Sequence, residues 1–248
     1  MSTFSRALCV LDLLDQGTIS FAERFQSFLE AEQLEIPYQV IDGIRQQHRL
    51  SELLDEPWAG LLISGSVHGV YEQTDWIQAV EALIRAAWQR NFPVFGICFG
   101  HQLIASALGG QVAKEQRWAF GTHPVFIQAE HPYLEGLESG FWTSQTHQDQ
   151  VTALPPGAEQ LGFSYQTAHQ MLACGSCFGV QFHPEYTADT LRYLGQQRIQ
   201  RFMEARIFHS PDHLEQYLAH LRPVDASRRV LRNFLLRLDF GVAPVATD

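Results

Sequence analysis

The stretch Pro93-Val94-Phe95-Gly96-Ile97-Cys98-Phe99-Gly100-His101-Gln102-Leu103-Ile104 joins an apolar run to a helical pattern, with a cysteine between the two. The run Val94–Ile97 predicts a buried strand, and the apolar residues after the cysteine recur at helical spacing. These residues are Phe99, Leu103, Ile104, Ala107 and Leu108. Cys98 is therefore predicted to occupy the turn between a strand and a helix.

A cysteine in such a turn fits the nucleophile of a hydrolase. At a helix N-terminus, the helix dipole and the unpaired N–H groups favour a thiolate over a thiol. Gly96 and Gly100 flank Cys98 and permit the sharp backbone of a nucleophile elbow. The segment alone leaves a second interpretation equally open, in which Cys98 is a small buried hydrophobic side chain.

Upstream of this stretch, short apolar runs alternate with helical patterns. Helices are predicted after an N-cap at Ser20, as a weaker segment over Leu50–Leu54, and after an N-cap at Asp75. Strands are predicted at Arg6–Leu14, Tyr38–Ile41 and Gly60–Ile63. Strands that alternate with helices in this way predict a parallel sheet with right-handed crossovers.

Downstream, the pattern changes after Gly109-Gly110, which we interpret as a helix stop. Residues 111–182 form short segments rich in Thr, Val, Phe and Tyr, separated by turns such as Pro155-Pro156-Gly157. Such segments predict antiparallel strands at one edge of the sheet. Three amphipathic helices are predicted after residue 187, at Leu191–Ile207, at Ser210–Leu221, and from Asp225 or Ser227 through Leu235.

Together these patterns predict an α/β fold. Its mostly parallel central sheet is flanked by helices, with an antiparallel edge and a C-terminal helical stretch. The length of 248 residues suits one core. We divide the chain into a main unit at 1–188, a helical stretch at 189–242 that packs on the same domain, and a tail at 243–248.

Composition narrows the classes of function. Hydrophobic residues make up 46% of the chain, which is enough for a sizeable core, and the net charge is −10. Negative charge repels phosphate backbones and anionic lipids, so we expect neither nucleic acid nor a membrane as a partner. The apolar stretch near the N-terminus is too short for a secretory signal, and four cysteines form no disulfide framework. We therefore expect a cytoplasmic protein.

The stretch Gly179-Val180-Gln181-Phe182-His183-Pro184-Glu185 offers the base that a cysteine nucleophile needs. An apolar strand would deliver His183 at its end, and Pro184 would prevent the strand from continuing. Glu185 lies two residues further on and can fold back onto the imidazole. A carboxylate on one ring nitrogen leaves the other nitrogen free for the sulfur. Taken alone, the same residues also fit an ordinary surface turn.

Both stretches together resemble the two signatures of class I glutamine amidotransferase domains, in the same order and at a typical separation. The similarity also covers Leu61-Leu62-Ile63-Ser64-Gly65-Ser66 and His147-Gln148-Asp149-Gln150-Val151. It spans residues 8–185 and points to free-standing proteins similar to the glutaminase domain of GMP synthase. The resemblance implies the flavodoxin-like fold of that family.

The resemblance implies a Cys-His-Glu triad. Cys98 would attack the γ-carboxamide of glutamine, His183 would protonate the departing ammonia and then activate water, and Glu185 would orient His183. The products would be glutamate and ammonia, formed through a γ-glutamyl thioester without a cofactor or a metal. The groups implied to hold the amino-acid end of glutamine are Gln102 and the backbone around Thr146, His147 and Gln148.

The oxyanion of the tetrahedral intermediate needs preorganised donors. The family provides the backbone N–H after the nucleophile, here that of Phe99, and one from a glycine loop, here that of Gly65 or Ser66. Family loops usually read Gly-Gly-Pro or Gly-Ser-Pro, whereas this one reads Gly65-Ser66-Val67-His68-Gly69. Without the proline, we expect the loop to move until a substrate or partner arrives.

A glutaminase domain usually supplies ammonia to a synthetase that activates an acceptor with ATP. No G-x-x-x-x-G-K-[ST] or G-x-G-x-x-G motif occurs in the chain. Three hypotheses follow: glutamine hydrolysis for a partner synthetase chain, hydrolysis of other γ-glutamyl compounds by a stand-alone enzyme, and a regulatory module that binds a ligand without turnover. The presence of all three triad residues counts against the last.

Two further motifs receive structural interpretations. Cys174-Gly175-Ser176-Cys177 precedes a strand rather than beginning a helix, which favours a two-residue hairpin turn over a redox pair or half of a zinc site. His209 and His213 are four residues apart, but Pro211 lies between them and no other ligand is evident. We interpret them as a solvated helix start.

Overall fold

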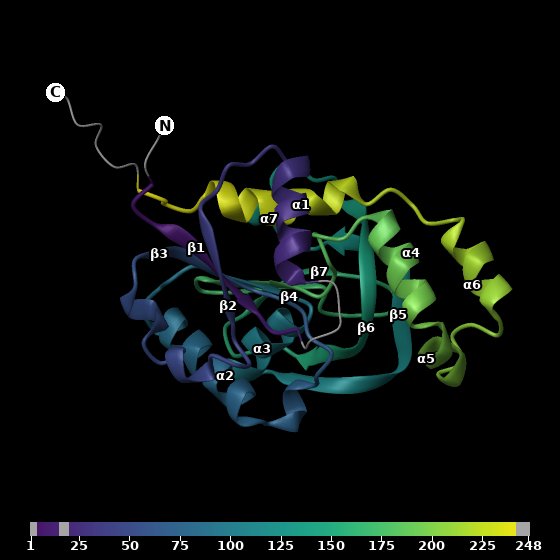
Figure 1. The fold of residues 1–248 in the computed structure, drawn as a ribbon, viewed down its shortest axis with the longest axis horizontal. Coiled ribbons are helices and arrows are strands. Elements are labelled where there is room, and N and C mark those ends of the chain that lie inside the picture. The colour runs from purple at the N-terminus through teal and green to yellow at the C-terminus, as the bar shows by residue number, and fades with distance from the viewer. Residues whose placement is uncertain (1–3, 15–19, 242–248) are drawn as a thin grey trace.

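The computed structural model describes residues 4–14 and 20–241, and in this part of the chain a nine-stranded sheet runs through the molecule (Figure 1). The order of its strands is β2-β1-β3-β4-β9-β8-β7-β5-β6. Their bounds are β1 Ala7–Asp12, β2 Tyr38–Asp42, β3 Trp58–Ile63, β4 Val94–Ile97, β5 Gln111–Ile127, β6 Gly140–Ala153, β7 Glu159–Phe163, β8 Met171–Cys174 and β9 Cys177–Val180.

The sheet has a parallel core and an antiparallel edge, which confirms the predicted fold class. Strands β2, β1, β3, β4 and β9 are parallel to one another. From β9 onward, every pairing through β8, β7, β5 and β6 is antiparallel. Strand β9 comes late in the chain and pairs with β4, so that Cys177 lies opposite Val94. The two stretches that contain Cys98 and His183 therefore end side by side.

Two helical layers cover the parallel core. Helices α1 (Phe21–Ala31) and α7 (Asp225–Leu236) lie on one face, and α2 (Asp75–Gln89) and α3 (Phe99–Ala107) lie on the other (Figure 1). Successive side chains of a strand point to opposite faces. Accordingly, Leu8 and Val10 of β1 pack in the cluster of α1 and α7, while Cys9 and Leu11 pack in that of α2 and α3.

Helices α4 (Ala188–Gln197), α5 (Ile199–Glu204) and α6 (Pro211–Leu218) form a separate lobe beside β5 and β6 (Figure 1). The lobe has its own cluster of buried side chains, built around Phe120 of β5 and Phe202 of α5. The Tyr217 hydroxyl donates to the Phe120 carbonyl at 2.8 Å. No helix in the described residues is long and apolar enough to span a bilayer.

Several predicted local features are present. The Ser20 side chain caps α1 by accepting from the Ala22 N–H, and Gly109 follows α3 with a φ of +96°. Cys174 pairs with Cys177 across a two-residue hairpin in which Gly175 has a φ of +58°. The Ala158 N–H bonds to the Pro155 carbonyl in the predicted proline turn. These features depend on neighbouring residues, which is why the sequence revealed them.

The helix predicted over Leu50–Leu54 is wrong. The structure has two single 3₁₀ turns there, Gln47–Arg49 and Leu53–Asp55. Pro57 disfavours a helical conformation at Glu56, which is extended with a ψ of 154°. The chain then enters β3 at once, so no room is left for an α-helix.

The helix predicted at Leu191–Ile207 is two helices, which meet at Arg198. The N-cap of α2 is Thr74, and Asp75 is its first helical residue. Helix α7 begins at Asp225, so that Ser227 lies inside it and donates to the Val224 carbonyl at 2.7 Å. The division into 1–188 and 189–242 stays a prediction, and the predicted tail 243–248 lies outside the described residues.

Candidate active site

Cys98 lies between β4 and α3, in the predicted strand-to-helix turn. Its φ of +51° and ψ of −97° are unusual for a residue with a side chain, and its N–H bonds to the Val180 carbonyl at 2.8 Å. A Cβ on Gly96 would lie 2.4 Å from the Gly100 carbonyl carbon, and one on Gly100 would lie 2.6 Å from the Ile63 carbonyl oxygen. Both positions therefore require glycine, and the backbone has the strained geometry of a nucleophile elbow.

His183 follows the end of β9 and is almost completely buried, with a relative accessibility of 4%. Its side-chain Nδ1 lies 2.8 Å from Glu185 Oε1, and its backbone N–H donates to the Ser144 carbonyl at 2.8 Å. A Cβ on Gly65 would lie 3.1 Å from His183 Cε1 and 3.7 Å from Cys98 Cβ. The structure thus brings the cysteine, the histidine and the glycine loop into contact around one point.

Electrostatics at this point favour a charged imidazole. Burial alone would lower the pKa of His183, but the neighbouring Tyr186, Glu185 and Cys98 groups outweigh that effect and raise it well above its ordinary value. The ring of Tyr186 stacks on the imidazole with centroids 4.1 Å apart. A charged imidazole beside Cys98 holds the proton that a leaving group needs.

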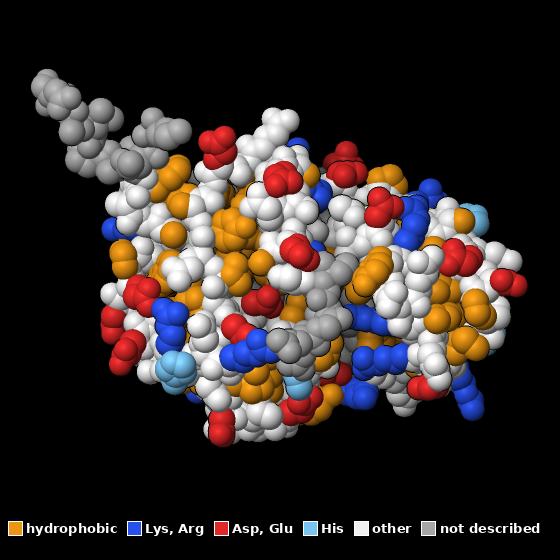
Figure 2. Space-filling model, in the orientation of Figure 1, with side chains coloured by type: hydrophobic (Ala, Val, Ile, Leu, Met, Phe, Trp, Pro, Cys, Tyr) orange, Lys and Arg blue, Asp and Glu red, His pale blue; other side chains and the backbone are white. Residues whose placement is uncertain are grey.

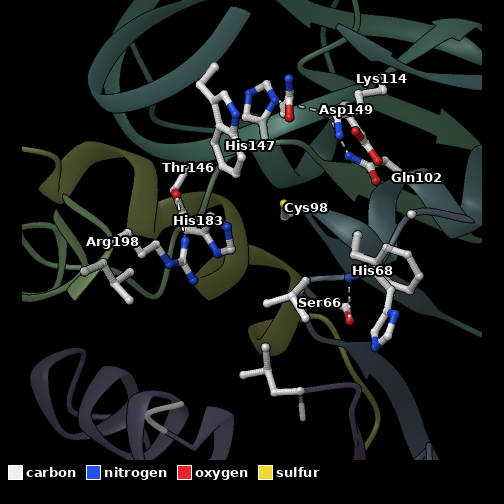
Figure 3. Close-up of a pocket in the computed structure, with 18 of the residues that line it drawn as sticks. Ser66, His68, Cys98, Gln102, Lys114, Thr146, His147, Asp149, His183 and Arg198 are labelled. Carbon is white, nitrogen blue, oxygen red and sulfur yellow. Dashed lines mark hydrogen bonds between the residues drawn. The ribbon is translucent and has the colours of Figure 1, made fainter. Parts of the chain in front are cut away.

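The glycine loop after β3 is held without the family's proline. The His68 imidazole lies 2.7 Å from Glu72 Oε2, and the Gly69 N–H donates to Glu72 Oε1 at 2.8 Å. The Ser66 hydroxyl accepts from the His68 N–H at 3.4 Å. Figure 3 shows Ser66 and His68 on one side of Cys98. The expected motion of this loop stays a prediction, as does the oxyanion role of Gly65, Ser66 and Phe99.

A cavity of about 250 Å³ opens above Cys98, and all four predicted substrate residues line it (Figure 3). The Gln102 amide donates to the Asp149 carbonyl at 2.9 Å and to Gln181 Oε1 at 3.2 Å. The Thr146 hydroxyl accepts from Arg198, and the Gln148 amide donates to the Glu115 carbonyl. The donor groups of Gln102 are therefore already bonded to the protein, and its contact with a substrate stays a prediction.

His147 is the fourth of these residues, and it differs from His183. Burial lowers its pKa to about 3, so the ring is neutral at pH 7. Its Nδ1 lies 3.1 Å from the Asp149 carbonyl and its Nε2 lies 3.3 Å from Gln145 Oε1, so the neutral ring can donate to one of these two acceptors. His147 is thus an uncharged member of the cavity wall.

The sequence reasoning missed several residues of the cavity. The Gln181 amide donates to Cys98 Sγ at 3.6 Å, and its position two residues before His183 was the available signal, because alternate residues share a strand face. Tyr186, Arg24 and Arg198 also line the cavity. Arg24 lies in α1 and Arg198 lies between α4 and α5, and no local pattern marks either of them.

The motifs that received structural interpretations lie outside the cavity. Cys174 and Cys177 form the hairpin described above and are free thiols. His209 and His213 are exposed at the start of α6, where the His209 N–H donates to His213 Nδ1 at 3.3 Å. Among the residues that the structure describes, no group of three or more His, Cys, Asp or Glu side chains could hold a metal ion.

Comparison with known proteins identifies relatives. The family model described as "Glutamine amidotransferase class-I" matches residues 28–202. A glutamine-hydrolyzing GMP synthase of Thermomicrobium roseum is 36% identical over 154 residues, which are 57% of this chain and 28% of the relative. Gamma-glutamyl peptidase 4 of Arabidopsis thaliana is 36% identical over 143 residues, which are 55% of this chain and 57% of the relative. The chain thus spans less than two thirds of either protein.

Solved structures share the fold. The crystal structure of a glutamine amidotransferase from Thermotoga maritima aligns with a TM-score of 0.69 and 19% identity, over 93% of this chain and 96% of that one. A glutamine amido transferase from Methylobacillus flagellatus aligns with a TM-score of 0.69 and 19% identity, over 99% of each chain. Both have the α/β architecture described above.

Proposed function

This chain belongs to the class I glutamine amidotransferase family, and on that premise we propose that it hydrolyses a γ-glutamyl amide bond through a thioester on Cys98. Glutamine is the default substrate. The observation that carries the proposal is the convergence of Cys98, the buried His183–Glu185 pair and Gly65 on one point at the floor of the cavity. A regulatory module that only binds a ligand would need no such convergence.

The reaction proceeds in two halves. The Cys98 sulfur attacks the γ-carbonyl carbon, and His183 donates its proton to the departing nitrogen as the C–N bond breaks. Ammonia leaves, and a γ-glutamyl thioester remains. Water then attacks the thioester while His183 accepts its proton, the C–S bond breaks, and glutamate leaves with the sulfur restored as a thiolate.

Other residues act by position and by charge. Glu185 orients His183 through the 2.8 Å contact to Nδ1, which leaves Nε2 for the sulfur and the leaving nitrogen. The Gln181 amide supports the thiolate through its contact with Sγ. The N–H of Phe99 at the start of α3, and that of Gly65 or Ser66, would bind the oxyanion.

The destination of the ammonia separates two versions of the proposal. Relatives named GMP synthase favour a partner synthetase chain, whereas the relative named gamma-glutamyl peptidase favours a stand-alone hydrolase of other γ-glutamyl compounds. We expect slow hydrolysis of glutamine by the purified protein. Either a partner from cell extract or another γ-glutamyl amide should raise kcat/KM more than tenfold, which is about 1.4 kcal/mol. Fast turnover of glutamine alone would remove the need for a partner.

Replacement of the nucleophile tests the proposal directly. Cys98→Ala should abolish release of glutamate from every γ-glutamyl amide while the circular dichroism spectrum stays unchanged, because the thioester cannot form. In the native protein Cys98 should be the first cysteine alkylated by iodoacetamide at neutral pH. Burial raises the pKa of Cys9 and of Cys177 to about 12 and also raises that of Cys174, so these thiols should react slowly. Activity that survives Cys98→Ala would overturn the mechanism.

A further inference from the structure

Three arginines line the part of the cavity that faces α1 and the α4–α6 lobe. They are Arg24 of α1, Arg198 at the junction of α4 and α5, and Arg201 of α5. The proposed mechanism uses none of them. Figure 2 shows Lys and Arg side chains gathered between the body of the molecule and the lobe, although the protein as a whole carries a net charge of −10.

Arg24 is a buried cation without a described carboxylate in direct contact, although its charge acts on Asp12 at longer range. It is 8% exposed, and its Nε has no hydrogen-bond partner. Its guanidinium lies over the ring of Tyr186 at 5.2 Å and pairs with no carboxylate of the described residues. Arg228, which is 7% exposed, shows how a buried arginine is usually neutralised, because its Nε bonds to the Glu32 carboxylate at 2.7 Å. A buried charge without such a contact is costly, so a carboxylate bound directly to Arg24 would stabilise it.

Arg198 and Arg201 add two more cations that form no salt bridge with the described carboxylates, although the charge of Arg201 acts on Asp149 at longer range. Arg198 donates to the neutral hydroxyl of Thr146 at 3.0 Å, and Arg201 lies over the Trp118 ring at 4.7 Å. Burial lowers the pKa of Arg198, and the charges of Arg201 and Arg24 lower it further, whereas Tyr186 and Cys98 raise it. Arg198 is thus close enough to the other two guanidinium groups to be repelled by both, and it also feels the charge of Cys98.

The position of the cluster relative to Cys98 indicates which part of a substrate it would meet. In Figure 3, Gln102, Lys114 and Asp149 lie on one side of Cys98, and Arg198 lies on the other. Thr146, which accepts from Arg198, lies on that second side as well. We place the glutamyl part of the substrate at the side of Gln102, so that the leaving amine points toward the arginines. Guanidinium groups bind carboxylates through paired, charge-assisted hydrogen bonds.

We propose that Arg24, Arg198 and Arg201 form a subsite for a carboxylate on the leaving amine, so that the preferred substrates are γ-glutamyl peptides or γ-glutamyl amino acids rather than glutamine. The inference rests on the proposed function and names its substrate class. Ammonia, the leaving group of glutamine, carries no carboxylate and would leave the three cations without a counter-ion.

Two substrates of almost equal size test the subsite, γ-glutamylglycine and γ-glutamylglycinamide. They differ only in the charge of the leaving group, and glycinamide is the less basic amine, so intrinsic reactivity does not favour the acid. We expect the native protein to prefer γ-glutamylglycine by at least tenfold in kcat/KM. Arg198→Gln and Arg201→Gln should each reduce this ratio to near one. Arg24→Gln should do the same, and Arg24→Lys, which restores a charge, should recover part of the ratio.

Arg222→Gln is the matched control. Arg222 lies over the Trp142 ring at 5.7 Å, as Arg201 lies over Trp118, but it does not line the cavity, so its loss should leave the ratio unchanged. Arg201 is exposed, so Arg201→Gln keeps the test valid if the buried Arg24 variants fail to fold.

The outcomes separate this inference from the proposed function. A native ratio near one overturns the subsite. So does an equal loss on both substrates in Arg198→Gln and Arg201→Gln, because the arginines would then bind the α-carboxylate that both substrates share. Turnover of neither peptide nor glutamine, with Cys98 unreactive toward iodoacetamide, would instead overturn the proposed function.

Discussion

The parallel core of the sheet and the α4–α6 lobe make different contributions to the same cavity, a rigid backbone around Cys98 in the first case and charged side chains in the second. At the ends of β3 and β4, the backbones approach so closely that Gly96 and Gly100 have no space for a Cβ, and Cys98 is held in a strained conformation. The lobe contacts the body through Phe120, the Tyr217 hydroxyl and the bond from Arg198 to Thr146, among other groups, and it contributes long charged side chains.

This difference separates the machinery of the reaction from the recognition of its substrate. Groups that make and break bonds need positions accurate to a fraction of an ångström, which a close-packed sheet can provide. Charges that recognise a carboxylate act over longer distances and tolerate more freedom. Changes near the parallel core should therefore affect every substrate, whereas changes in the lobe should alter the preference among substrates.

The largest effect is expected at the histidine beside the core. His183→Ala should lower kcat by on the order of a thousandfold or more on all γ-glutamyl amides, close to the loss in Cys98→Ala. Glu185→Gln should lose less, because an amide can still bond to Nδ1 and orient the ring. Steady-state kinetics on glutamine and on both glycine substrates measure these losses, and a fully active His183→Ala would contradict the assigned base.

A smaller effect, on stability, is expected from Gly100→Ala. The new methyl group would meet the Ile63 carbonyl at about 2.6 Å, and backbone atoms cannot move aside easily. We expect a loss of about 1–3 kcal/mol in the free energy of unfolding, together with lower activity on every substrate. Urea denaturation measures the first quantity. An unchanged midpoint with full activity would show that the elbow is less rigid than the core around it.

Acidification should lower the stability of the protein through buried neutral histidines near both the parallel core and the antiparallel edge. Burial lowers the pKa of His101 in α3 and of His147 in β6 to about 3, well below the value of about 6.5 in an unfolded chain. The unfolded state therefore takes up these protons first, so stability should fall as the pH drops below about 6.5, by up to about 1.4 kcal/mol per pH unit for each histidine. Urea unfolding at pH 6.5 and pH 5 measures the fall, because His183, with its raised pKa, has the opposite effect only above about pH 6.5. His147→Gln should reduce it, and a native stability that does not change over this range would contradict the expectation.

The smallest effect is expected at the contact between the lobe and the body. Tyr217→Phe removes the hydrogen bond to the Phe120 carbonyl and should lower the free energy of unfolding by about 1 kcal/mol. Because Arg198 and Arg201 belong to the lobe, the preference for γ-glutamylglycine should decline while turnover of γ-glutamylglycinamide changes little. The ratio of the two kcat/KM values measures this. An equal decline on both substrates would show that the lobe also positions the nucleophile.

The structural features that the sequence predicted correctly are those that depend on residues adjacent in the chain. The turn at Cys98, the Ser20 cap and the Cys174–Cys177 hairpin each follow from the conformations that a few adjacent side chains allow. The prediction failed over Leu50–Leu54, where apolar spacing indicated a helix but Pro57 and the nearby start of β3 left no length for one. It also treated Leu191–Ile207 as continuous, although the helix is interrupted at Arg198.

The amino-acid sequence alone determined the α/β class, the strand-to-helix turn at Cys98 and the pairing of His183 with Glu185, because each is a local pattern of polarity, glycine and proline. Tertiary structure alone decided that β9 pairs with β4 and brings His183 to Cys98. It also decided that Arg24 and Arg198, 174 positions apart, share one cavity. Contacts between distant residues follow from how the layers pack together, and the local sequence around each residue does not encode them.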